Sequence, residues 1–537
     1  MNDTQVIVVG AGPVGLTLSI ALARLGVSCI LLERNEAPSG LPKMERCNAR
    51  TMEIYRRLGI ADEIRAAGLP AECPMDVFVV TSLVEEPILR LPYGSVKECK
   101  EDIAAHNDGT RTLEPYQLIS QYTLEPLLKR IAESEPDIDV RFGCEFVRFE
   151  DDGERVTAQV KRSDGSRESI TGDYLVGCDG AASPVRKQMG IKLAGEGDML
   201  TLCQALFRCD DLYERIPIGK GRHYHVCDDQ AGFIIVQDDT RHFTLHAVVD
   251  DESEMPKLFE KIVAMPVDYE TLFIGQWTQR LLVADRYRDG RVFIAGDAAH
   301  LVIPTGGLGM NTGVGDVIDL AWKLQGTLQG WGGAGLPASY ETERRQVGVR
   351  NVAASGRANA GRRKWRSAWR PEIRDKTAEG AAIRANVAEI ANKEQRKTNE
   401  ILGIEAGYRY VDSPLIWPEP GDGPDPNNPD YVPTTWPGFR LPHVWLKDGT
   451  ALLDHCGPGY TLLRFDEDRV DMSALIAAFE KQGAPITVLA FADPHAVEIY
   501  EGYELFLLRP DLHIVWRGNA APADPEALAA VATGHKT

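Results

Sequence analysis

The stretch that most constrains this chain is residues 6–15, Val-Ile-Val-Val-Gly-Ala-Gly-Pro-Val-Gly. Four β-branched residues that run directly into spaced glycines predict a buried parallel strand, a tight turn and the start of a helix. In such a unit Gly10 allows the chain to turn, Gly12 allows the backbone to approach a pyrophosphate, and Gly15 allows the helix to pack closely on the strand. We therefore expect an anionic diphosphate at the helix N-terminus.

An acidic residue completes this pattern. The apolar run at 29–32 predicts a second strand, which ends at Glu33, 18 residues after Gly15. A carboxylate at that strand end can accept hydrogen bonds from both hydroxyls of an adenosine ribose, whereas a 2′-phosphate would require a basic residue. The pattern therefore predicts FAD or NAD, in preference to NADP, at this site.

Composition limits the classes of function. A chain of 537 residues exceeds what one hydrophobic core usually serves, so about two to four domains are expected. The net charge of -20 argues against nucleic-acid and anionic-membrane partners. Ten cysteines without a Cys-x-x-Cys pair or metal-like spacing predict neither a metal site nor a disulfide framework. Because no apolar stretch is long enough for a membrane span or placed as in a leader peptide, we expect a cytoplasmic protein.

Two more acids stand where strands are predicted to end. Asp179 follows the apolar run at 174–178, and Asp297 follows the run at 292–296. In an open α/β sheet, ligands bind beyond the carboxyl ends of the strands. Both acids are therefore candidates for a ligand site.

These stretches resemble the FAD-dependent aromatic hydroxylases, the group A flavoprotein monooxygenases that include phenol hydroxylases and 3-hydroxyphenylpropionate hydroxylases. Three motifs of the family occur in the family's order: the N-terminal glycines with Glu33-Arg34, Cys178-Asp179-Gly180 followed by Ser183-Pro184-Val185-Arg186, and Gly296-Asp297-Ala298-Ala299-His300 continuing through Pro304-Thr305-Gly306-Gly307-Leu308-Gly309-Met310-Asn311. The resemblance covers residues 1 to about 350. Leu308 and Asp319 depart from it, since the family often has Gln and Asn there.

The resemblance implies how FAD would be held. Asp297 would hold the ribityl chain, and the backbone from Gly309 to Asn311 would meet the flavin pyrimidine, where negative charge gathers on reduction. Arg46 and Gln121 would reach the diphosphate, although Arg46 also suits a substrate anion or a helix surface. Asp179 would serve both the flavin and NAD(P)H. The implied cofactor-binding residues are Gly10, Gly12, Pro13, Val14, Gly15, Glu33, Arg34, Arg46, Gln121, Asp179, Gly180, Gly296, Asp297, Gly307, Gly309, Met310 and Asn311.

The predicted fold class is α/β, with a Rossmann-like FAD-binding domain, an inserted antiparallel-sheet substrate domain and a C-terminal thioredoxin-like domain. The last domain contains a single cysteine, Cys456, so we expect it to serve packing or homodimerisation and not dithiol chemistry. The predicted divisions are the FAD-binding domain at 1–189 and 281–350, the substrate domain at 190–280, a helical segment at 351–413, a proline-rich linker at 414–442 and the thioredoxin-like domain at 443–537.

The catalytic candidates follow from the need to activate a phenol, whose pKa lies near 10. Glu45 stands where the phenol hydroxylases carry a catalytic acid, so it is a candidate base; an ion pair with Arg46 or Lys43 is the alternative. His223, Tyr224 and His225 lie on a predicted roof strand, where alternation points Tyr224 away from both histidines. Pro304 is carried over from the third motif. The catalytic candidates are Glu45, His223, Tyr224, His225 and Pro304.

The implied function is an FAD-dependent monooxygenase that uses NAD(P)H and O2 to hydroxylate a small phenolic substrate through a flavin C4a-hydroperoxide. One alternative is a flavin monooxygenase that hydroxylates a polycyclic substrate or performs Baeyer-Villiger insertion on a ketone. Two others are an FAD-dependent dehydrogenase and a non-catalytic flavin-binding protein. Because the cofactor carries this chemistry, the sequence identifies the cofactor more directly than the substrate.

Overall fold

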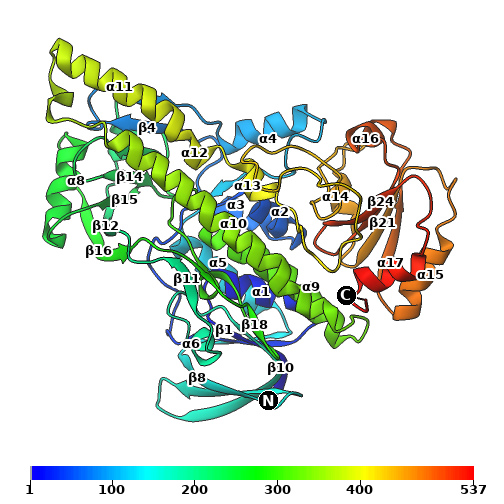
Figure 1. The fold of residues 1–537 in the computed structure, drawn as a ribbon. Helices are drawn as coiled ribbons and strands as arrows, with labels where there is room; N and C mark the ends of the chain where they lie inside the picture. Colours follow the sequence, from blue (N-terminus) through cyan, green and yellow to red (C-terminus); the bar gives the residue numbers. More distant parts are fainter. Residues whose placement is uncertain (1–2, 537) are drawn as a thin grey trace.

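A computed structural model describes residues 3–536, and its first sheet is built around the N-terminal strand (Figure 1). The central strands run parallel in the order β19-β10-β1-β2-β7. Val6–Val9 of β1, all of β2 and β19, and the last four residues of β10 are buried and mostly apolar, as expected of strands covered on both faces. The strands of this sheet are β1 (Asp3–Val9), β2 (Cys29–Leu32), β7 (Ile138–Arg141), β8 (Cys144–Asp151), β9 (Val156–Arg162), β10 (Arg167–Gly177), β18 (Arg288–Asp289) and β19 (Val292–Ile294).

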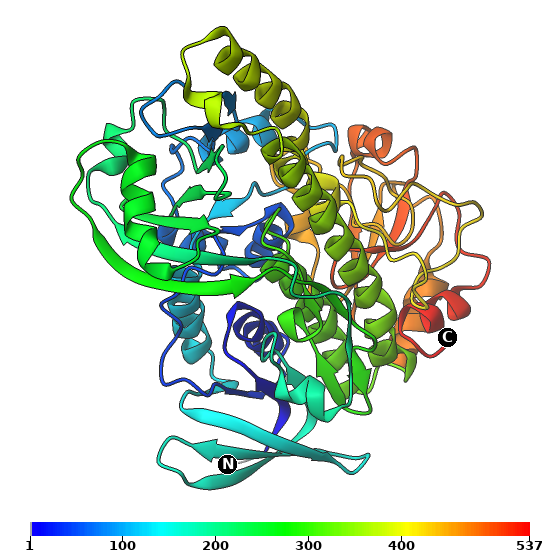
Figure 2. The same cartoon turned by 60° about the vertical axis from the view of Figure 1, so that its left-hand side comes forward.

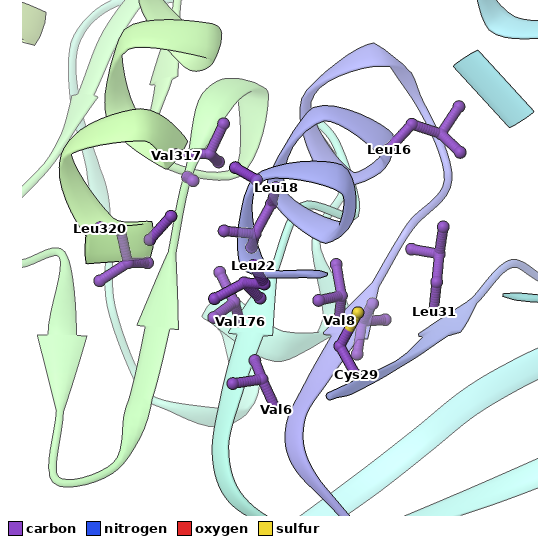
Figure 3. Close-up of a cluster of buried hydrophobic side chains, with 14 of the residues drawn as sticks. Val6, Val8, Leu16, Leu18, Leu22, Cys29, Leu31, Val176, Val317 and Leu320 are labelled. Atoms are coloured by element: carbon purple, nitrogen blue, oxygen red, sulfur yellow. The ribbon is translucent and has the colours of Figure 1, made fainter. Parts of the chain in front are cut away.

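Helices α1 and α9 form the core of this domain with the sheet. Figure 3 shows Leu18 and Leu22 of α1 beside Val176 of β10 and Val317 of α9, all fully buried. Close approach of the two helices requires glycine, since a Cβ on Gly313 would lie 2.6 Å from a methyl carbon of Val14. The helices of this half are α1 (Pro13–Arg24), α2 (Ala49–Arg57), α3 (Ala61–Ala67), α5 (Gln121–Ser134), α6 (Pro184–Gln188) and α9 (Gly309–Leu328).

A second, seven-stranded sheet lies across from the first (Figure 2). Its order is β16-β12-β15-β14-β13-β4-β5, antiparallel except for the β13–β4 pair. The elements here are β4 (Val77–Val80), β5 (Leu89–Leu91), β12 (Thr201–Arg208), β13 (His223–Val226), β14 (Phe233–Val236), β15 (His242–Ala247) and β16 (Glu270–Thr278), with α4 (Val96–Ala105), α7 (Leu212–Arg215) and α8 (Met255–Val263).

This sheet extends beyond the expected segment at 190–280. Strands β4 and β5 come from residues 77–91, and β4 joins the sheet by pairing with β13, for example Phe78 with Tyr224. Alternation within one segment cannot reveal a pairing with a strand more than a hundred residues away. Short strands connect the two halves: β3 (Arg46–Cys47), β6 (Gln117–Leu118), β11 (Leu193–Glu196), β17 (Leu281–Ala284) and β20 (His300–Leu301).

A single long helix, α10 (Gly335–Arg366), crosses the molecule from the C-terminal module to the seven-stranded sheet (Figure 1). It continues past residue 350, where the FAD-binding domain was expected to end. Three helices follow it: α11 (Ala378–Glu394), α12 (Arg396–Asn399) and α13 (Leu402–Ala406). Residues 414–442, all described, contain neither helix nor strand apart from isolated bridges.

The C-terminal module packs against α9 and α10. Its sheet has the order β22-β21-β23-β24, with one parallel and two antiparallel pairs. Trp322 of α9 and Leu336 of α10 share a hydrophobic core with Tyr460 and Phe479 of the module. The elements are α14 (Leu452–His455), β21 (Tyr460–Arg464), α15 (Ser473–Gln482), β22 (Ile486–Ala490), α16 (Pro494–Ile499), β23 (Leu505–Leu508), β24 (Ile514–Gly518) and α17 (Pro525–Ala532).

Candidate active site

One cavity of about 620 Å³ lies between the two large sheets. One side is formed by the carboxyl ends of the parallel strands, with Gly10, Glu33 and Asp179 in its wall. The other side is formed by strands β12 to β16 of the seven-stranded sheet. The cavity therefore lies where an open α/β sheet binds its ligands. It brings together Gly10, Gly12, Pro13, Val14, Glu33, Arg34, Glu45, Arg46, Gln121, Asp179, Gly180, His223, Asp297, Pro304, Gly307, Gly309, Met310 and Asn311.

The three N-terminal glycines occupy different environments. A Cβ on Gly15 would lie 1.9 Å from the carbonyl oxygen of Gly10, and a Cβ on Gly10 would lie 2.5 Å from that of Cys178. By contrast, the nearest atom to a Cβ on Gly12 would be a carboxylate oxygen of Glu125, 4.0 Å away. Gly10 and Gly15 are therefore required by packing, whereas Gly12 keeps space open at the N-terminus of α1. That open space fits a diphosphate.

Glu33 joins the end of β2 to the glycine turn. Its Oε2 accepts a hydrogen bond from the backbone N–H of Ala11 at 2.9 Å, and its Oε1 accepts from the backbone and side-chain nitrogens of Asn35 at 2.9 and 2.6 Å. These bonds fix the carboxylate at the cavity wall. Each carboxylate oxygen can accept more than one bond, so a ribose hydroxyl can still be accommodated.

Asp179 and Asp297 both present carboxylates that the surrounding protein does not fully satisfy. Asp179 Oδ2 accepts from the N–H of Val185 at 3.0 Å, while Oδ1 is buried without a partner among the described residues. Asp297 lines the cavity with an exposed side chain that makes no hydrogen bond to residues 3–536, and desolvation by the surrounding protein raises its pKa. Unsatisfied acceptors of this kind suit the hydroxyl donors of a polar ligand.

The loop from Pro304 to Gly309 carries the third motif to the cavity. Gly306 and Gly307 adopt φ values of +91° and +64°, a region that favours glycine. The Asn311 side chain holds the loop, donating to the carbonyl oxygen of Gly307 at 2.6 Å and accepting from the N–H of Asn48 at 2.9 Å. Because α9 begins at Gly309, the N–H groups of its first turn have no intrahelical acceptors.

Arg46 lines the cavity, and a buried ion pair holds one of its nitrogens. Its Nη2 donates to Glu405 at 2.6 Å and to the carbonyl oxygen of Gly306 at 2.8 Å, in a buried ion pair. A Cβ on Gly307 would lie 2.9 Å from Arg46 Nε. The guanidinium is thus committed to the glycine loop and to Glu405, a partner 359 residues away that spacing does not reveal.

Gln121 reaches the cavity together with Glu125, which the sequence reasoning missed. Gln121 Nε2 donates to Glu125 Oε1 at 2.5 Å, and Glu125 Oε2 accepts from the N–H of Ser39 at 2.9 Å. Burial raises the pKa of Glu125. The i,i+4 spacing of the two residues at the start of α5 was the available signal.

Glu45 is paired with His223, and not with Arg46 or Lys43. Its Oε2 lies 2.6 Å from His223 Nε2, across the gap between the loop at 42–46 and strand β13. Burial by itself would raise the pKa of Glu45, but the interactions with His223, together with the charges of Arg222 and Arg46, outweigh it and lower the pKa to about 2. Burial lowers the pKa of His223.

The other two catalytic candidates on β13, Tyr224 and His225, lie away from the cavity. Tyr224 packs on Phe78 with ring centroids 5.2 Å apart, and its hydroxyl donates to the carbonyl oxygen of Gly219 at 2.9 Å. His225 lies behind His223, and its Nε2 is 3.1 Å from Gln395 Nε2. Neither side chain lines the cavity, so the catalytic roles expected for Tyr224 and His225 are not supported by their positions. Only the direction of alternation was predictable; which residues line the cavity depends on the neighbouring elements.

Aromatic side chains of the seven-stranded sheet form one wall of the cavity. Phe233 and His246 are cross-strand partners whose rings stack 4.6 Å apart with planes 10° apart. Trp277 lies edge-on to His246 and donates its indole N–H to His246 Nδ1 at 3.1 Å. Phe233, His246 and Trp277, here called the aromatic wall, all line the cavity. The sequence shows the alternation within each short strand, but it does not show that these three side chains lie on the same face of the sheet.

Two kinds of feature are absent from residues 3–536. No helix in this range combines the length and apolarity needed to cross a membrane. Within the same range, no group of three or more His, Cys, Asp or Glu side chains is arranged to hold a metal ion.

Comparisons with known proteins agree with this geometry. A family model described as an FAD binding domain matches residues 3–355, and one described as the C-terminal domain of aromatic-ring hydroxylases matches residues 434–534. The FAD-dependent monooxygenase apdD of Emericella nidulans is 33% identical over 98% of this chain and 89% of its own. Aklavinone 12-hydroxylase RdmE of Streptomyces purpurascens is 32% identical over 98% of this chain and 97% of its own.

A solved structure shows the same likeness over the whole chain. The structure of RebC with bound 7-carboxy-K252c superposes with a TM-score of 0.91, at 31% identity, covering 99% of both chains. These matches confirm the resemblance to flavoprotein hydroxylases and FAD as the cofactor. The chain therefore belongs to the family of FAD-dependent monooxygenases that hydroxylate aromatic compounds.

Proposed function

We propose that this enzyme hydroxylates a planar fused-ring aromatic compound that carries a phenolic hydroxyl, and that it consumes NAD(P)H and O2. The aromatic wall carries the proposal, because stacked rings along one side of the cavity suit a flat ligand of several rings. The aklavinone hydroxylase and the RebC complex support a polycyclic ligand in related proteins. A fused-ring substrate is therefore favoured over a single-ring phenol.

The residues around the cavity fit FAD from end to end. The open N-terminus of α1 at Gly12 would receive the diphosphate, and Glu33 would accept the adenosine ribose hydroxyls. Asp297 would accept from the ribityl hydroxyls, and the first turn of α9 at Gly309 would donate to the flavin pyrimidine. Arg46 would act indirectly by holding the glycine loop through Gly306.

When bound, FAD supplies the redox chemistry that activates O2 and delivers one oxygen atom to the ring. The protein must place the substrate ring and exclude water. The aromatic wall would hold the ring against the cofactor side, and Pro304 would contribute an apolar contact in the opposite wall. Asp179, at the end of β10, would face the nicotinamide donor and the flavin in turn.

Glu45 would accept a hydrogen bond from the phenolic hydroxyl and would not remove the proton outright. The pKa of Glu45 is lowered and lies far below that of a phenol, so full proton transfer to this carboxylate is unfavourable. His223 must carry its proton on Nε2 to face the Glu45 carboxylate, because a lone pair there would be repelled. His223 thus positions Glu45, whose second oxygen would polarise the phenol and raise the electron density of the ring.

The C-terminal module has the mixed sheet expected of a thioredoxin-like fold, with β21 central and parallel to β22. We assign it a packing role. Arg509 of this module lies between Glu343 of α10 and Asp319 of α9, at 2.6 and 2.7 Å, with all three side chains buried. Its single cysteine, Cys456, is buried and has a raised pKa of about 11, so it is a poor nucleophile.

The proposal is tested by substrate-stimulated O2 uptake. The FAD-loaded protein would be mixed with NADH or NADPH and a panel of single-ring phenols, hydroxynaphthoquinones and hydroxyanthraquinones. We expect stimulation by the fused-ring compounds and products that have gained one oxygen atom. Stimulation confined to single-ring phenols would contradict the substrate class. A product that has lost two hydrogens without gaining oxygen would instead indicate a dehydrogenase.

A further inference from the structure

The last turns of α10 bring a cation without a counter-ion into the cavity wall. Arg362 lines the cavity, and its guanidinium lies 5.1 Å from the centroid of the Phe233 ring in the aromatic wall. Among the described residues, no hydrogen bond or ion pair involves its guanidinium, and Nε is buried without an acceptor. The Phe233 ring holds the charge in place but does not neutralise it.

Two neighbouring arginines increase the positive charge of this wall. Arg366 donates to the carbonyl oxygens of Val226 and Gly232 at 3.1 and 3.0 Å. Arg222 donates to Asn399 Oδ1 at 2.7 Å, while its Nε and Nη1 are buried without acceptors. All of these acceptors are neutral, so they satisfy donors without compensating charge.

Carboxylates near these cations are few. Glu45 is the acid that faces them from within the cavity, and its Oε2 is already bound to His223. Glu405 interacts with Arg222 but is already paired with Arg46. Asp228 interacts with Arg366 from outside the cavity and accepts from the N–H of Gly232. Burial lowers the pKa of Arg362 to about 9 and that of Arg366 to about 10, yet both remain charged at neutral pH.

Arg362 is half-buried and has no counter-ion, and a cation that is partly withdrawn from water without one is costly, so a cavity that retains it is expected to receive an anion. A guanidinium that is stacked on an aromatic ring keeps both Nη groups free for a bidentate contact with a carboxylate. We propose that the substrate of this enzyme is an aromatic acid, whose rings lie against Phe233 and whose carboxylate binds Arg362. This inference rests on the proposed function and specifies its substrate class.

The nucleotide cofactors offer a competing source of anionic groups. The position of Arg362 disfavours the nucleotides as its ligand. Its guanidinium lies beside the aromatic wall of the seven-stranded sheet, whereas the expected diphosphate site at Gly12 is at the N-terminus of α1. The test must nevertheless separate the two sources, because both a carboxylate and a phosphate bind arginine well.

The test compares 1,8-dihydroxyanthraquinone-3-carboxylic acid with its methyl ester, which replaces the negative charge by a methyl group and leaves the ring system unchanged. Dissociation constants for the FAD-loaded protein would be measured by perturbation of the flavin absorbance, in parallel with KM for NADH and NADPH. The variants are Arg362→Gln, the conservative Arg362→Lys, and Arg357→Gln as a matched control on the exposed face of α10. FAD content and melting temperature would be recorded for each.

We expect the wild type to bind the acid roughly ten- to hundredfold more tightly than the ester. Arg362→Gln should abolish this preference while leaving the affinity for the ester and KM for the nicotinamide donor unchanged. Arg362→Lys should retain part of the preference, and Arg357→Gln all of it.

Equal affinity for acid and ester in the wild type, or an acid preference that survives Arg362→Gln, would overturn the carboxylate site while leaving a fused-ring substrate intact. A rise in KM for NADH or NADPH alone would assign Arg362 to the nucleotide. If neither compound binds, the fused-ring proposal itself fails and this inference fails with it.

Discussion

The carboxylate of Glu45 lies 2.6 Å from Nε2 of His223, although the two residues are 178 positions apart. The loop that carries Glu45 is held in place by Gln204 of the seven-stranded sheet, whose side chain donates to the carbonyl oxygen of Pro42 at 2.7 Å. His223 of the same sheet fixes one carboxylate oxygen of Glu45, and the other oxygen remains available to a ligand. The pair is thus assembled only when the two halves of the molecule come together.

Glu45→Gln is expected to lower the rate of hydroxylation by roughly ten- to hundredfold, because a neutral amide replaces a charged hydrogen-bond acceptor. NAD(P)H oxidation should persist and hydrogen peroxide should accumulate. Since the pKa of Glu45 is about 2, the wild type should show no loss of activity from this group between pH 5 and pH 8. Product yield and peroxide release would be measured together across that range; an unchanged yield in the variant would remove Glu45 from the mechanism.

Asp297→Ala is expected to yield folded protein with little bound FAD, because the carboxylate lines the cavity and makes no hydrogen bond to any of residues 3–536. Asp289→Ala, at an exposed position on the edge strand β18, is the control. The ratio of flavin to protein after purification decides the matter. Full occupancy in Asp297→Ala would contradict the proposed ribityl contact.

Two glycine substitutions should separate folding from cofactor binding. Gly15→Ala places a Cβ 1.9 Å from a backbone oxygen, so we expect a strongly destabilised protein. Gly12→Ala meets only an atom at 4.0 Å, so the apoprotein should melt near the wild-type temperature yet bind FAD weakly. Thermal melts of the apoproteins and FAD titrations test both statements. Equal loss of stability in the two variants would show that Gly12 is required by packing.

His246 should make the protein sensitive to acid. Burial lowers its pKa from 6.5 to about 3, so the unfolded chain binds a proton at this residue that the folded chain does not bind between these values. Stability is therefore complete above pH 6.5 and is lost as the pH falls toward 3. The slope attributable to this residue is up to about 1.4 kcal/mol per pH unit.

His246→Gln keeps an acceptor for the Trp277 indole and removes the titrating group. Urea unfolding at pH 7.5, 6.0 and 5.0 should show a gap between wild type and variant that shrinks as the pH falls. Curves that stay parallel would contradict the linkage.

Arg509→Met should cost about 3–5 kcal/mol of unfolding free energy, because it leaves Asp319, Glu343 and Asp511 as buried carboxylates with too few partners. Arg469→Met breaks an exposed pair with Glu504 and should cost less than about 1 kcal/mol. Denaturant unfolding of both variants measures the contrast. Similar small losses would show that the C-terminal module is not anchored through Arg509.

The arrangement of the residues expected to bind the cofactor could be predicted from the sequence. Gly10, Gly12, Gly15 and Glu33 lie within one strand-turn-helix-strand unit, where spacing along the chain fixes spacing in space. The placement of Asp179 and Asp297 beside this unit could be predicted as well, because parallel strands end at the same edge of a sheet.

The contacts of the residues expected near the substrate could be seen only in the tertiary structure. Glu45 could be predicted as a candidate but not as the partner of His223, and Arg46 was expected at the diphosphate but is bound to Glu405. Alternation along a strand gives two faces without saying which element covers either one, so the pattern could not place Tyr224. Arg362 lies on a helix, and its place beside Phe233 depends on how α10 packs on the sheet. The contacts of Glu45 and Arg46 join residues 178 and 359 positions apart, and only packing brings them together.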